Sequence, residues 1–238
     1  PSPPFPYRAL SCSVGRVARG SCLVLPHGDA IHAVGVTCTH YCAPLADGTV
    51  IDGTLHCPWH HACFDLATGA LRHGPALTPL PAWHVEQRDG RVFVTERIEP
   101  VPPRRSAGPD PVLIIGAGAA GVNVADTLRR EGYAGRIGMI SRELQLPYDQ
   151  PDLSKDFLAG AAPAEWLLLH PPEHYENQRI ELRLGVTVSS IDTAAKRITT
   201  SLGERLAFGA LVLATGGSPR VLSVSGAERV RDLRTRSD

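Results

Sequence analysis

The hydrophobic positions of this chain follow two different patterns, one before and one after residue 100. In residues 1–100, short apolar runs such as Ile31–Val36 are separated by turn signals, of which Asp52-Gly53 and Asp89-Gly90 are examples. Short runs that alternate with Asp-Gly turns are typical of antiparallel strands joined by hairpins. We therefore expect a small all-β domain over residues 1–100.

After residue 111 the pattern is that of alternating strands and helices. Val112–Ile115 predicts a buried strand, Ala119–Glu131 a helix and Arg136–Ile140 a second strand. This strand–helix–strand order is typical of a parallel α/β sheet of the Rossmann kind. The fold class is thus expected to be multidomain, with an α/β Rossmann-like domain over residues 111–238.

A proline-rich segment separates the two patterns. Glu99–Pro111 contains five prolines and shows no apolar periodicity. Proline fixes φ and lacks the N–H that helices and sheets require. Residues 101–110 are therefore expected to form an extended linker between the domains.

Composition and charge exclude several function classes. Hydrophobic residues make up 43% of the 238 positions and charged residues 20%, which is typical of a globular protein. Lys and Arg (24) balance Asp and Glu (24), so the net charge gives no support to binding of nucleic acid or of a membrane surface. No apolar run is long enough for a membrane span and no signal peptide is visible, so we expect a cytoplasmic protein.

Two Cys–His pairs carry the chemistry of the first domain. The candidate ligands are Cys38 and His40 in one pair and Cys57 and His60 in the other. Two thiolates and two imidazoles suit either a tetrahedral zinc ion or a two-iron, two-sulfide cluster with both cysteines on one iron and both histidines on the other. The C-x-H and C-x-x-H spacings differ from those of a zinc finger, and no finger-type helix follows. These features favour the cluster.

The flanking sequences strengthen this interpretation. Residues 7–97, which include CTHYCAPLADG and HCPWHHACFDLATG, resemble a Rieske domain. The resemblance implies a [2Fe-2S] cluster on the four ligands named above. Neutral imidazoles in place of two thiolates would raise its reduction potential above that of an all-cysteine ferredoxin.

Two further cysteines follow the ligand loops. Cys42 and Cys63 are interpreted as free buried thiols, while a Cys42–Cys63 disulfide, of the kind that joins the loops in some Rieske proteins, is a hypothesis if the Cα atoms lie within about 7 Å. The family residue at position 42 is normally Gly. His61 is expected to pack rather than to bind metal. No partner at a metal-ligand spacing is found for three other histidines, His32, His73 and His84.

A glycine-rich turn opens the predicted helix of the second domain. Gly116, Gly118 and Gly121 form a G-x-G-x-x-G pattern, in which the first glycine makes the tight turn, the second admits a pyrophosphate and the third lets the helix pack against the strand. Glu143, beyond the second strand, is the candidate acceptor for the adenosine ribose. Asp126 comes too early for this role and is expected on the helix surface.

Two later segments indicate FAD. Residues 146–155 (LPYDQPDLSK) resemble the PYDRPPLSK segment of FAD-dependent ferredoxin reductases and of apoptosis-inducing-factor-type flavoproteins. Residues 211–216 (LVLATG) resemble the strand and ATG turn that close the FAD site in the same group. The chain departs from the pattern at Gln150, where the family has Arg, so that a neutral amide replaces a charged fork.

The resemblance also implies roles for individual residues. Lys155 would lie near the flavin ring, with a solvated surface lysine as the alternative, and Arg220 would lie near the pyrophosphate. Val188 would offer its backbone to the adenine. The ATG turn would contribute Ala214, Thr215 and Gly216.

Two other chemistries are not expected in the second domain. His170 and His174 lie four residues apart, but Pro171 and Pro172 between them are expected to prevent a helix from aligning them at a metal. No C-x-x-x-x-C follows the glycine loop, which argues against a disulfide reductase.

As a pair, the domains resemble the Rieske-containing apoptosis-inducing-factor-like oxidoreductases. The resemblance implies electron transfer from NAD(P)H via FAD to the cluster, and on to a redox partner protein or small-molecule acceptor. It also implies truncation of the chain and of its FAD site, because the family inserts an NAD(P)H-binding domain near residues 233–238; we expect no NAD(P)H oxidation by this chain alone. The alternatives are a non-enzymatic Rieske electron carrier with an incomplete flavin-like docking domain and, ranked below it, a Rieske terminal oxygenase.

Overall fold

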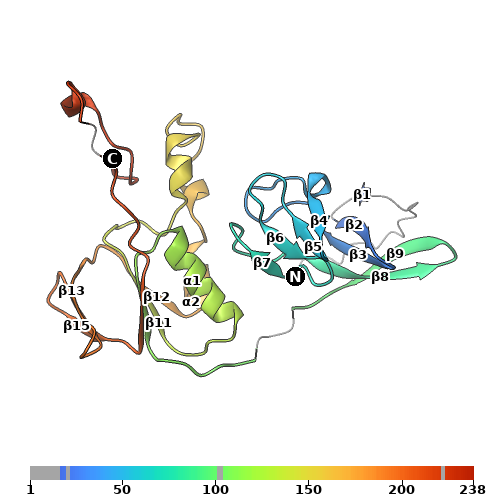
Figure 1. The fold of residues 1–238 in the computed structure, drawn as a ribbon, viewed down its shortest axis with the longest axis horizontal. Coiled ribbons are helices and arrows are strands. Elements are labelled where there is room, and N and C mark those ends of the chain that lie inside the picture. Colours follow the sequence, from blue (N-terminus) through green and yellow to red (C-terminus); the bar gives the residue numbers. More distant parts are fainter. Residues whose placement is uncertain (1–16, 20–21, 101–103, 221–222) are drawn as a thin grey trace. The chain divides into compact units, whose positions relative to one another are not determined.

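The chain forms two compact units, which are described separately. A computed structural model describes residues 17–19, 22–100, 104–220 and 223–238. Unit 1 comprises Pro1–Val101 and unit 2 comprises Pro102–Asp238 (Figure 1). Within the described ranges, no helix combines the length and the apolar character that a membrane crossing requires.

Unit 1 consists of two antiparallel sheets, which confirms the all-β prediction. The larger sheet has the order β1 (Val17–Arg19), β2 (Cys22–His27), β3 (Ala30–Gly35), β8 (Ala82–Arg88) and β9 (Arg91–Arg97). The smaller has the order β4 (Thr49–Ile51), β5 (Thr54–His56), β6 (Cys63–Asp65) and β7 (Leu71–His73), and a 3-10 helix, η1 (Leu45–Asp47), precedes it.

Two of the predicted Asp-Gly turns make the hairpins of unit 1. Asp52 and Gly53 have φ angles of 47° and 75°, and Asp89 and Gly90 have φ angles of 50° and 69°. Two consecutive positive φ angles define the type I′ turn, whose twist matches that of the flanking strands. The local sequence therefore determines the β4–β5 and β8–β9 pairings.

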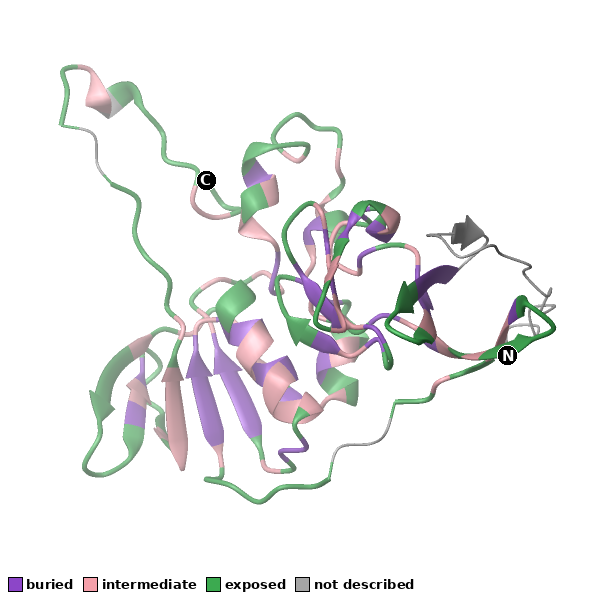
Figure 2. Ribbon diagram, turned by 45° about the vertical axis from the view of Figure 1, so that its right-hand side comes forward, coloured by how far each residue is buried: buried purple, intermediate pink, exposed green. Residues whose placement is uncertain are grey.

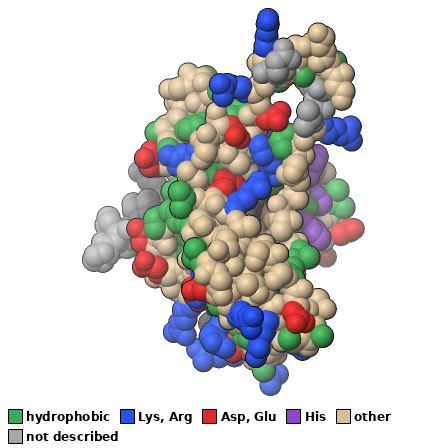
Figure 3. All heavy atoms as spheres, turned by 90° about the vertical axis from the view of Figure 1, so that its left-hand side faces the viewer, with side chains coloured by type: hydrophobic (Ala, Val, Ile, Leu, Met, Phe, Trp, Pro, Cys, Tyr) green, Lys and Arg blue, Asp and Glu red, His purple; other side chains and the backbone are tan. Residues whose placement is uncertain are grey.

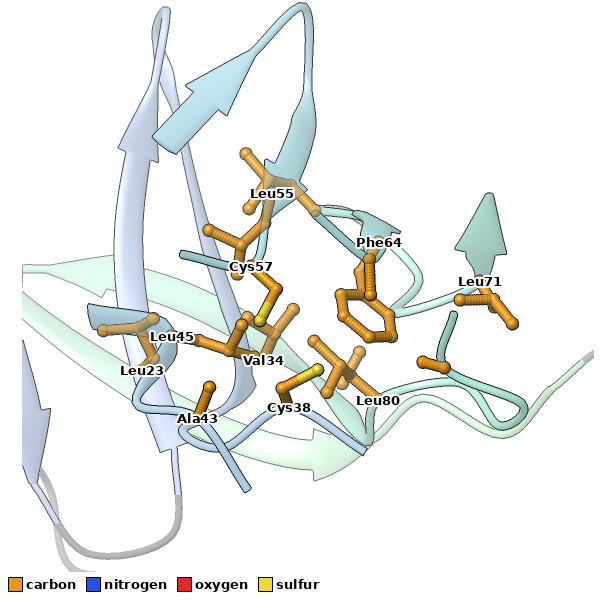
Figure 4. Close-up of a cluster of buried hydrophobic side chains, with 14 of the residues drawn as sticks. Leu23, Val34, Cys38, Ala43, Leu45, Leu55, Cys57, Phe64, Leu71 and Leu80 are labelled. Atoms are coloured by element: carbon orange, nitrogen blue, oxygen red, sulfur yellow. The ribbon is translucent and has the colours of Figure 1, made fainter. Parts of the chain in front are cut away.

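The core of unit 1 includes two of the candidate ligand cysteines. Leu23, Leu45 and Phe64 are at most 1% exposed, and the side chains of Cys38 and Cys57, each 1% exposed, lie in the same cluster (Figure 4). The contacts that hold the two sheets together therefore also fix the positions of both sulfur atoms.

Unit 2 is built on a four-stranded parallel sheet, which confirms the α/β prediction. Its order is β12 (Ile180–Arg183), β11 (Ile137–Ile140), β10 (Val112–Ile115) and β16 (Ala210–Leu213), with the helix α1 (Ala119–Arg130) between β10 and β11. Successive strands extend from β10 in one direction, and the chain then returns to place β16 on its other side. Such a reversal marks the crevice at which open α/β sheets bind ligands.

Further elements surround this sheet. They are a three-stranded antiparallel sheet, β13 (Val188–Asp192), β14 (Arg197–Thr200) and β15 (Arg205–Ala207), the short helix α2 (Pro172–Asn177), and the 3-10 helices η2 (Gln150–Ser154), η3 (Ala164–Leu167) and η4 (Ala227–Arg229). Every residue of β10 and β11 is buried (Figure 2). Ile198 of the three-stranded sheet packs with Leu113, Ile115 and Ile140 on one face.

The proline-rich segment contributes its second half to unit 2. Ser106 N donates a hydrogen bond to Gly132 O at 2.9 Å, and Tyr133 Oη donates to Pro109 O at 2.6 Å. The boundary between the compact units falls at Val101 and Pro102. Basic and acidic side chains are interspersed on the face shown in Figure 3, in keeping with the zero net charge.

The central strand gives a direct test of this packing. We expect Ile114→Ala to lower the free energy of unfolding by about 2–5 kcal/mol, because Ile114 is 0% exposed and the truncation leaves a cavity. The matched control is Ile191→Ala on β13, where Ile191 is 40% exposed and the loss should stay below about 1 kcal/mol. Urea unfolding followed by circular dichroism measures both, and equal losses would contradict the assignment of β10 to the core.

Candidate functional site

The two ligand loops of unit 1 share one backbone pattern. Cys38 N donates to Ala43 O at 2.9 Å and accepts at its own carbonyl from Cys42 N at 3.0 Å. Cys57 N donates to Ala62 O at 2.8 Å, and its carbonyl accepts from His61 N at 3.2 Å. Each loop thus turns back on its own cysteine in the same way.

A left-handed residue closes each loop. Cys42 has φ 55° and His61 has φ 59°, and both stand four positions after the ligand cysteine. Side chains are disfavoured at such angles, which explains why glycine suits position 42 in the family that this loop resembles.

The four candidate ligands form an inner sulfur pair and an outer imidazole pair. Cys38 and Cys57 are 1% exposed, whereas His60 is exposed and His40 is partly buried. The imidazole rings of His40 and His60 have centroids 5.0 Å apart and planes at 84°. This separation of sulfur and nitrogen donors suits an inner iron on cysteine and an outer iron on histidine.

Burial affects the protonation of Cys38 in the inner pair. It raises the pKa of the Cys38 thiol to about 11, while backbone N–H groups of His40 and Tyr41 that face the sulfur act in the opposite direction and the neighbouring Cys57 thiol raises the pKa further. Metal insertion must therefore release protons from this site.

The spread of the four donors distinguishes a cluster from a single ion. Among the described residues, three donor atoms within 4.8 Å of one another occur only at Asp126, His170 and His174. The Cys/His set of unit 1 is more widely spaced than a mononuclear zinc site requires. The donor types and their spacing fit a two-iron cluster.

The other cysteines of the loops are free. Cys63 is buried, and its Sγ lies 3.2 Å from His56 Nδ1 and donates to His61 O at 3.1 Å. Cys42 is also free but exposed, so the expectation of a buried thiol there is wrong. His61 is exposed as well, which does not support the packing role expected for it.

A cavity of about 570 Å³ lies at the carboxyl ends of β10, β11 and β16, whose last residues line it. This volume is within the range of about 300–1,000 Å³ that is usual for cofactor sites. Seven of the residues proposed from the sequence line it, namely Gly116, Gly118, Glu143, Val188, Ala214, Thr215 and Gly216. Gly121, Lys155 and Arg220 do not line it.

The three glycines of the turn have different surroundings. A Cβ on Gly116 would lie 2.1 Å from Ala214 O, and a Cβ on Gly121 would lie 2.0 Å from Gly116 O. A Cβ on Gly118 would meet no atom within 4 Å. The first and third glycines therefore permit close packing of the backbone, whereas Gly118 faces the cavity, as approach of a pyrophosphate requires.

Glu143 is held in place by a buried tyrosine. Tyr148 Oη donates to Glu143 Oε2 at 2.6 Å and accepts from Arg236 N at 3.0 Å. Burial, together with the Glu143 carboxylate, raises the pKa of Tyr148, so this hydroxyl stays protonated and donates at neutral pH. The other carboxylate oxygen of Glu143 makes no hydrogen bond with a described residue. It can therefore accept a hydrogen bond from a ligand.

The last residues of the chain also line the cavity, which the sequence did not predict. Arg234 Nη1 donates to Gln150 Oε1, and Arg234 Nε donates to Gly217 O at 3.1 Å. The cavity therefore has a guanidinium, supplied by Arg234 and oriented by the amide that replaces the arginine of related sequences. Nothing in the local sequence of residues 233–238 indicates this long-range contact.

Lys155 and Arg220 lie apart from this arrangement. Lys155 Nζ lies 3.7 Å from Asp152 Oδ1, with a side chain that is 57% exposed. Arg220 is exposed. Their proposed flavin contacts stay predictions.

A second side-chain group was misjudged from the sequence. Asp126 is 8% exposed rather than on the helix surface, and His170 and His174 both hydrogen bond to it. Pro171 and Pro172 do not separate the histidines, because they begin α2 at its N-cap and first position and so place His174 one turn from His170.

Comparison with known proteins gives two family matches. Residues 110–238 match the pyridine nucleotide-disulphide oxidoreductase family, and residues 12–84 match the Rieske [2Fe-2S] domain. Apoptosis-inducing factor 3 of Homo sapiens is 36% identical over 235 residues, which cover 92% of this chain and 38% of that protein. The chain therefore spans well under half the length of this relative.

Reductases of multicomponent systems match the second unit. The ferredoxin–NAD(+) reductase component of the p-cumate 2,3-dioxygenase system of Pseudomonas putida is 46% identical over 129 residues, which cover 53% of this chain and 32% of that protein. The structure of the covalent putidaredoxin reductase–putidaredoxin complex aligns with a TM-score of 0.52 and 40% identity, over 56% of this chain and 33% of the other.

The ligand assignment is tested by two cysteine substitutions. We expect Cys57→Ser to lose the cluster, with loss of protein-bound iron and of visible charge-transfer absorption, because one iron would keep a single thiolate. The matched control is Cys42→Ser, which changes an exposed thiol of the partner loop and should retain both signals. Retention of iron in Cys57→Ser, or its loss in Cys42→Ser, would contradict the ligand set.

Proposed function

This chain belongs to the pyridine nucleotide-disulphide oxidoreductase family and carries a Rieske [2Fe-2S] domain, and on that basis we propose that it supplies the cluster site and a flavin-nucleotide cavity for electron transfer from NAD(P)H, through FAD and the cluster, to an acceptor protein. The observation that carries the proposal is that one chain presents two separate cofactor sites. Paired cysteine and histidine donors lie in unit 1, and a glycine-lined cavity lies at the switch point of the sheet in unit 2.

The residues of unit 2 would bind and orient the flavin nucleotide. Gly118 and the N-terminus of α1 present backbone N–H groups to the pyrophosphate, and Arg234 adds a positive charge at the cavity. Glu143, oriented by Tyr148, accepts from the ribose hydroxyls. When bound, FAD supplies the conversion of two-electron donation by a nicotinamide into one-electron steps, which is the chemistry that the protein itself lacks.

The residues of unit 1 would hold the cluster and expose one edge of it. Cys38 and Cys57 anchor the buried side, and His60 is exposed beside Trp59, which is 55% exposed. Electrons would leave through this histidine edge, because it is the part of the ligand set that another molecule can approach. The names of the similar reductases, which belong to ferredoxin and putidaredoxin systems, support a protein as acceptor.

A second candidate is a non-enzymatic Rieske electron carrier in which unit 2 serves for docking. It is favoured by the position of residues 234–237 at the cavity, where Arg236 N binds Tyr148 Oη and Gln145 Nε2 lies 3.5 Å from Ser237 Oγ. In this case unit 2 would not hold flavin. Bound flavin therefore discriminates between the two candidates.

The visible spectrum of the purified chain tests the proposal. We expect cluster bands and flavin bands together, with Gly118→Val removing the flavin bands alone, because its side chain enters the cavity without contacting protein atoms. The control is Ser190→Val on β13, an exposed position that does not line the cavity, and it should keep the flavin. Cluster bands without flavin in the unaltered chain would favour the carrier, and flavin retained in Gly118→Val would refute the assigned cavity.

A further inference from the structure

Two imidazoles converge on one buried carboxylate in unit 2. His170 Nε2 lies 2.7 Å from Asp126 Oδ2, and His174 Nε2 lies 2.8 Å from Asp126 Oδ1. Asp126 is 8% exposed and His170 is 7% exposed, while His174 is 22% exposed at the side chain. None of the three residues lines the nucleotide cavity, so this group is not part of the flavin site.

The fold of the segment before α2 explains the convergence. Pro171 and Pro172 hold the backbone extended and then start the helix, which brings His174 back beside His170. The two rings stack with centroids 3.7 Å apart and planes at 15°. Asp126 comes from α1, 44 residues earlier, and presents one oxygen to each ring.

The ring of a buried tyrosine packs against the same group. Tyr175 is 3% exposed, and its Oη has no hydrogen-bond partner among the described residues. Its ring packs edge-on against both imidazoles, with centroid distances of 5.6 Å to His174 and 6.2 Å to His170. A buried hydroxyl without a partner is destabilising, so its presence indicates a polar atom that the protein itself does not supply.

We propose that Asp126, His170 and His174 bind a divalent zinc-type ion, with a water molecule as fourth ligand that accepts from Tyr175 Oη. The three donor atoms lie within 4.8 Å of one another. Two imidazole nitrogens and one carboxylate oxygen suit zinc and its neighbours, whereas calcium and magnesium require oxygen ligands. The ion would connect α1 to α2 and so link two helices of unit 2.

Ion binding requires one change in the observed geometry. A metal ion lies in the plane of each imidazole ring that binds it. In the present stack the two ring planes are nearly parallel, so one ion does not lie in both planes. The rings must therefore tilt apart, which His174 can do because it lies at the partly exposed side of the group. Its exposure also gives the ion access from solvent.

The experiment measures zinc in the purified chain whose cluster iron has been verified. After equilibration with Zn²⁺ and dialysis, we expect about one zinc per chain by elemental analysis, and half-saturation at least about tenfold weaker in Asp126→Asn and His174→Gln. His84→Gln, at a histidine in unit 1 outside the group, is the matched control and should bind like the unaltered chain. Equal zinc in Asp126→Asn and in the unaltered chain would overturn the proposal, as would no zinc in the unaltered chain.

The ligands of the bound ion are identified by X-ray absorption at the zinc edge. We expect nitrogen and oxygen neighbours at about 2.0–2.2 Å and no sulfur. A sulfur shell at about 2.3 Å would place the zinc on Cys38 and Cys57 instead and would overturn the proposal. Circular dichroism and the cluster spectrum of each variant show whether it is folded, and His174→Gln, which changes the partly exposed member, keeps the test valid if Asp126→Asn does not fold.

Discussion

The hydrophobic core of unit 1 includes the sulfur atoms of the two cysteines proposed as ligands of its cluster. Cys38 and Cys57 are packed with Leu45, Leu55 and Phe64, so the contacts that close the two sheets also bring the two thiols together. This burial raises the pKa of the Cys38 thiol and keeps it protonated until metal arrives, while the loops that follow carry the histidines outward. The candidate metal centre thus has a buried side, formed by the two cysteines in the core, and an approachable side, formed by the two histidines outside it.

In unit 2 the corresponding constraint is the close approach of three backbone segments. Gly116 lies against the carbonyl of Ala214, and Gly121 lies against the carbonyl of Gly116, so that the turn after β10, the start of α1 and the end of β16 occupy very little space. Small residues, chiefly Gly and Ala, line the cavity where these segments meet. Arg234 and Glu143 then supply charged side chains to its lining.

The sequence predicted those features that depend on local patterns. Asp52-Gly53 and Asp89-Gly90 fixed hairpins, and the apolar run Val112–Ile115 identified the central strand, because turn geometry and burial are encoded over a few residues. The sequence did not predict the convergence of His170 and His174 on Asp126, because a proline pair can break a helix or begin one, and here it begins α2. The contact of Arg234 with Gln150 could not be predicted, because 84 residues separate them. The prediction that Cys42 is buried is wrong, because its exposure depends on a backbone φ angle that the alternation of apolar and polar residues does not indicate.

The left-handed residues that close the two ligand loops have a thermodynamic consequence. A side chain at such a φ angle is disfavoured by about 1–2 kcal/mol, and both Cys42 and His61 carry one. Without metal, this strain lowers the resistance of both loops to local opening, and amide hydrogens there should exchange before those of the sheets. With the cluster bound, the four proposed ligand bonds to iron would connect both loops. The cofactor would then restrict local opening at the end of the domain that carries it.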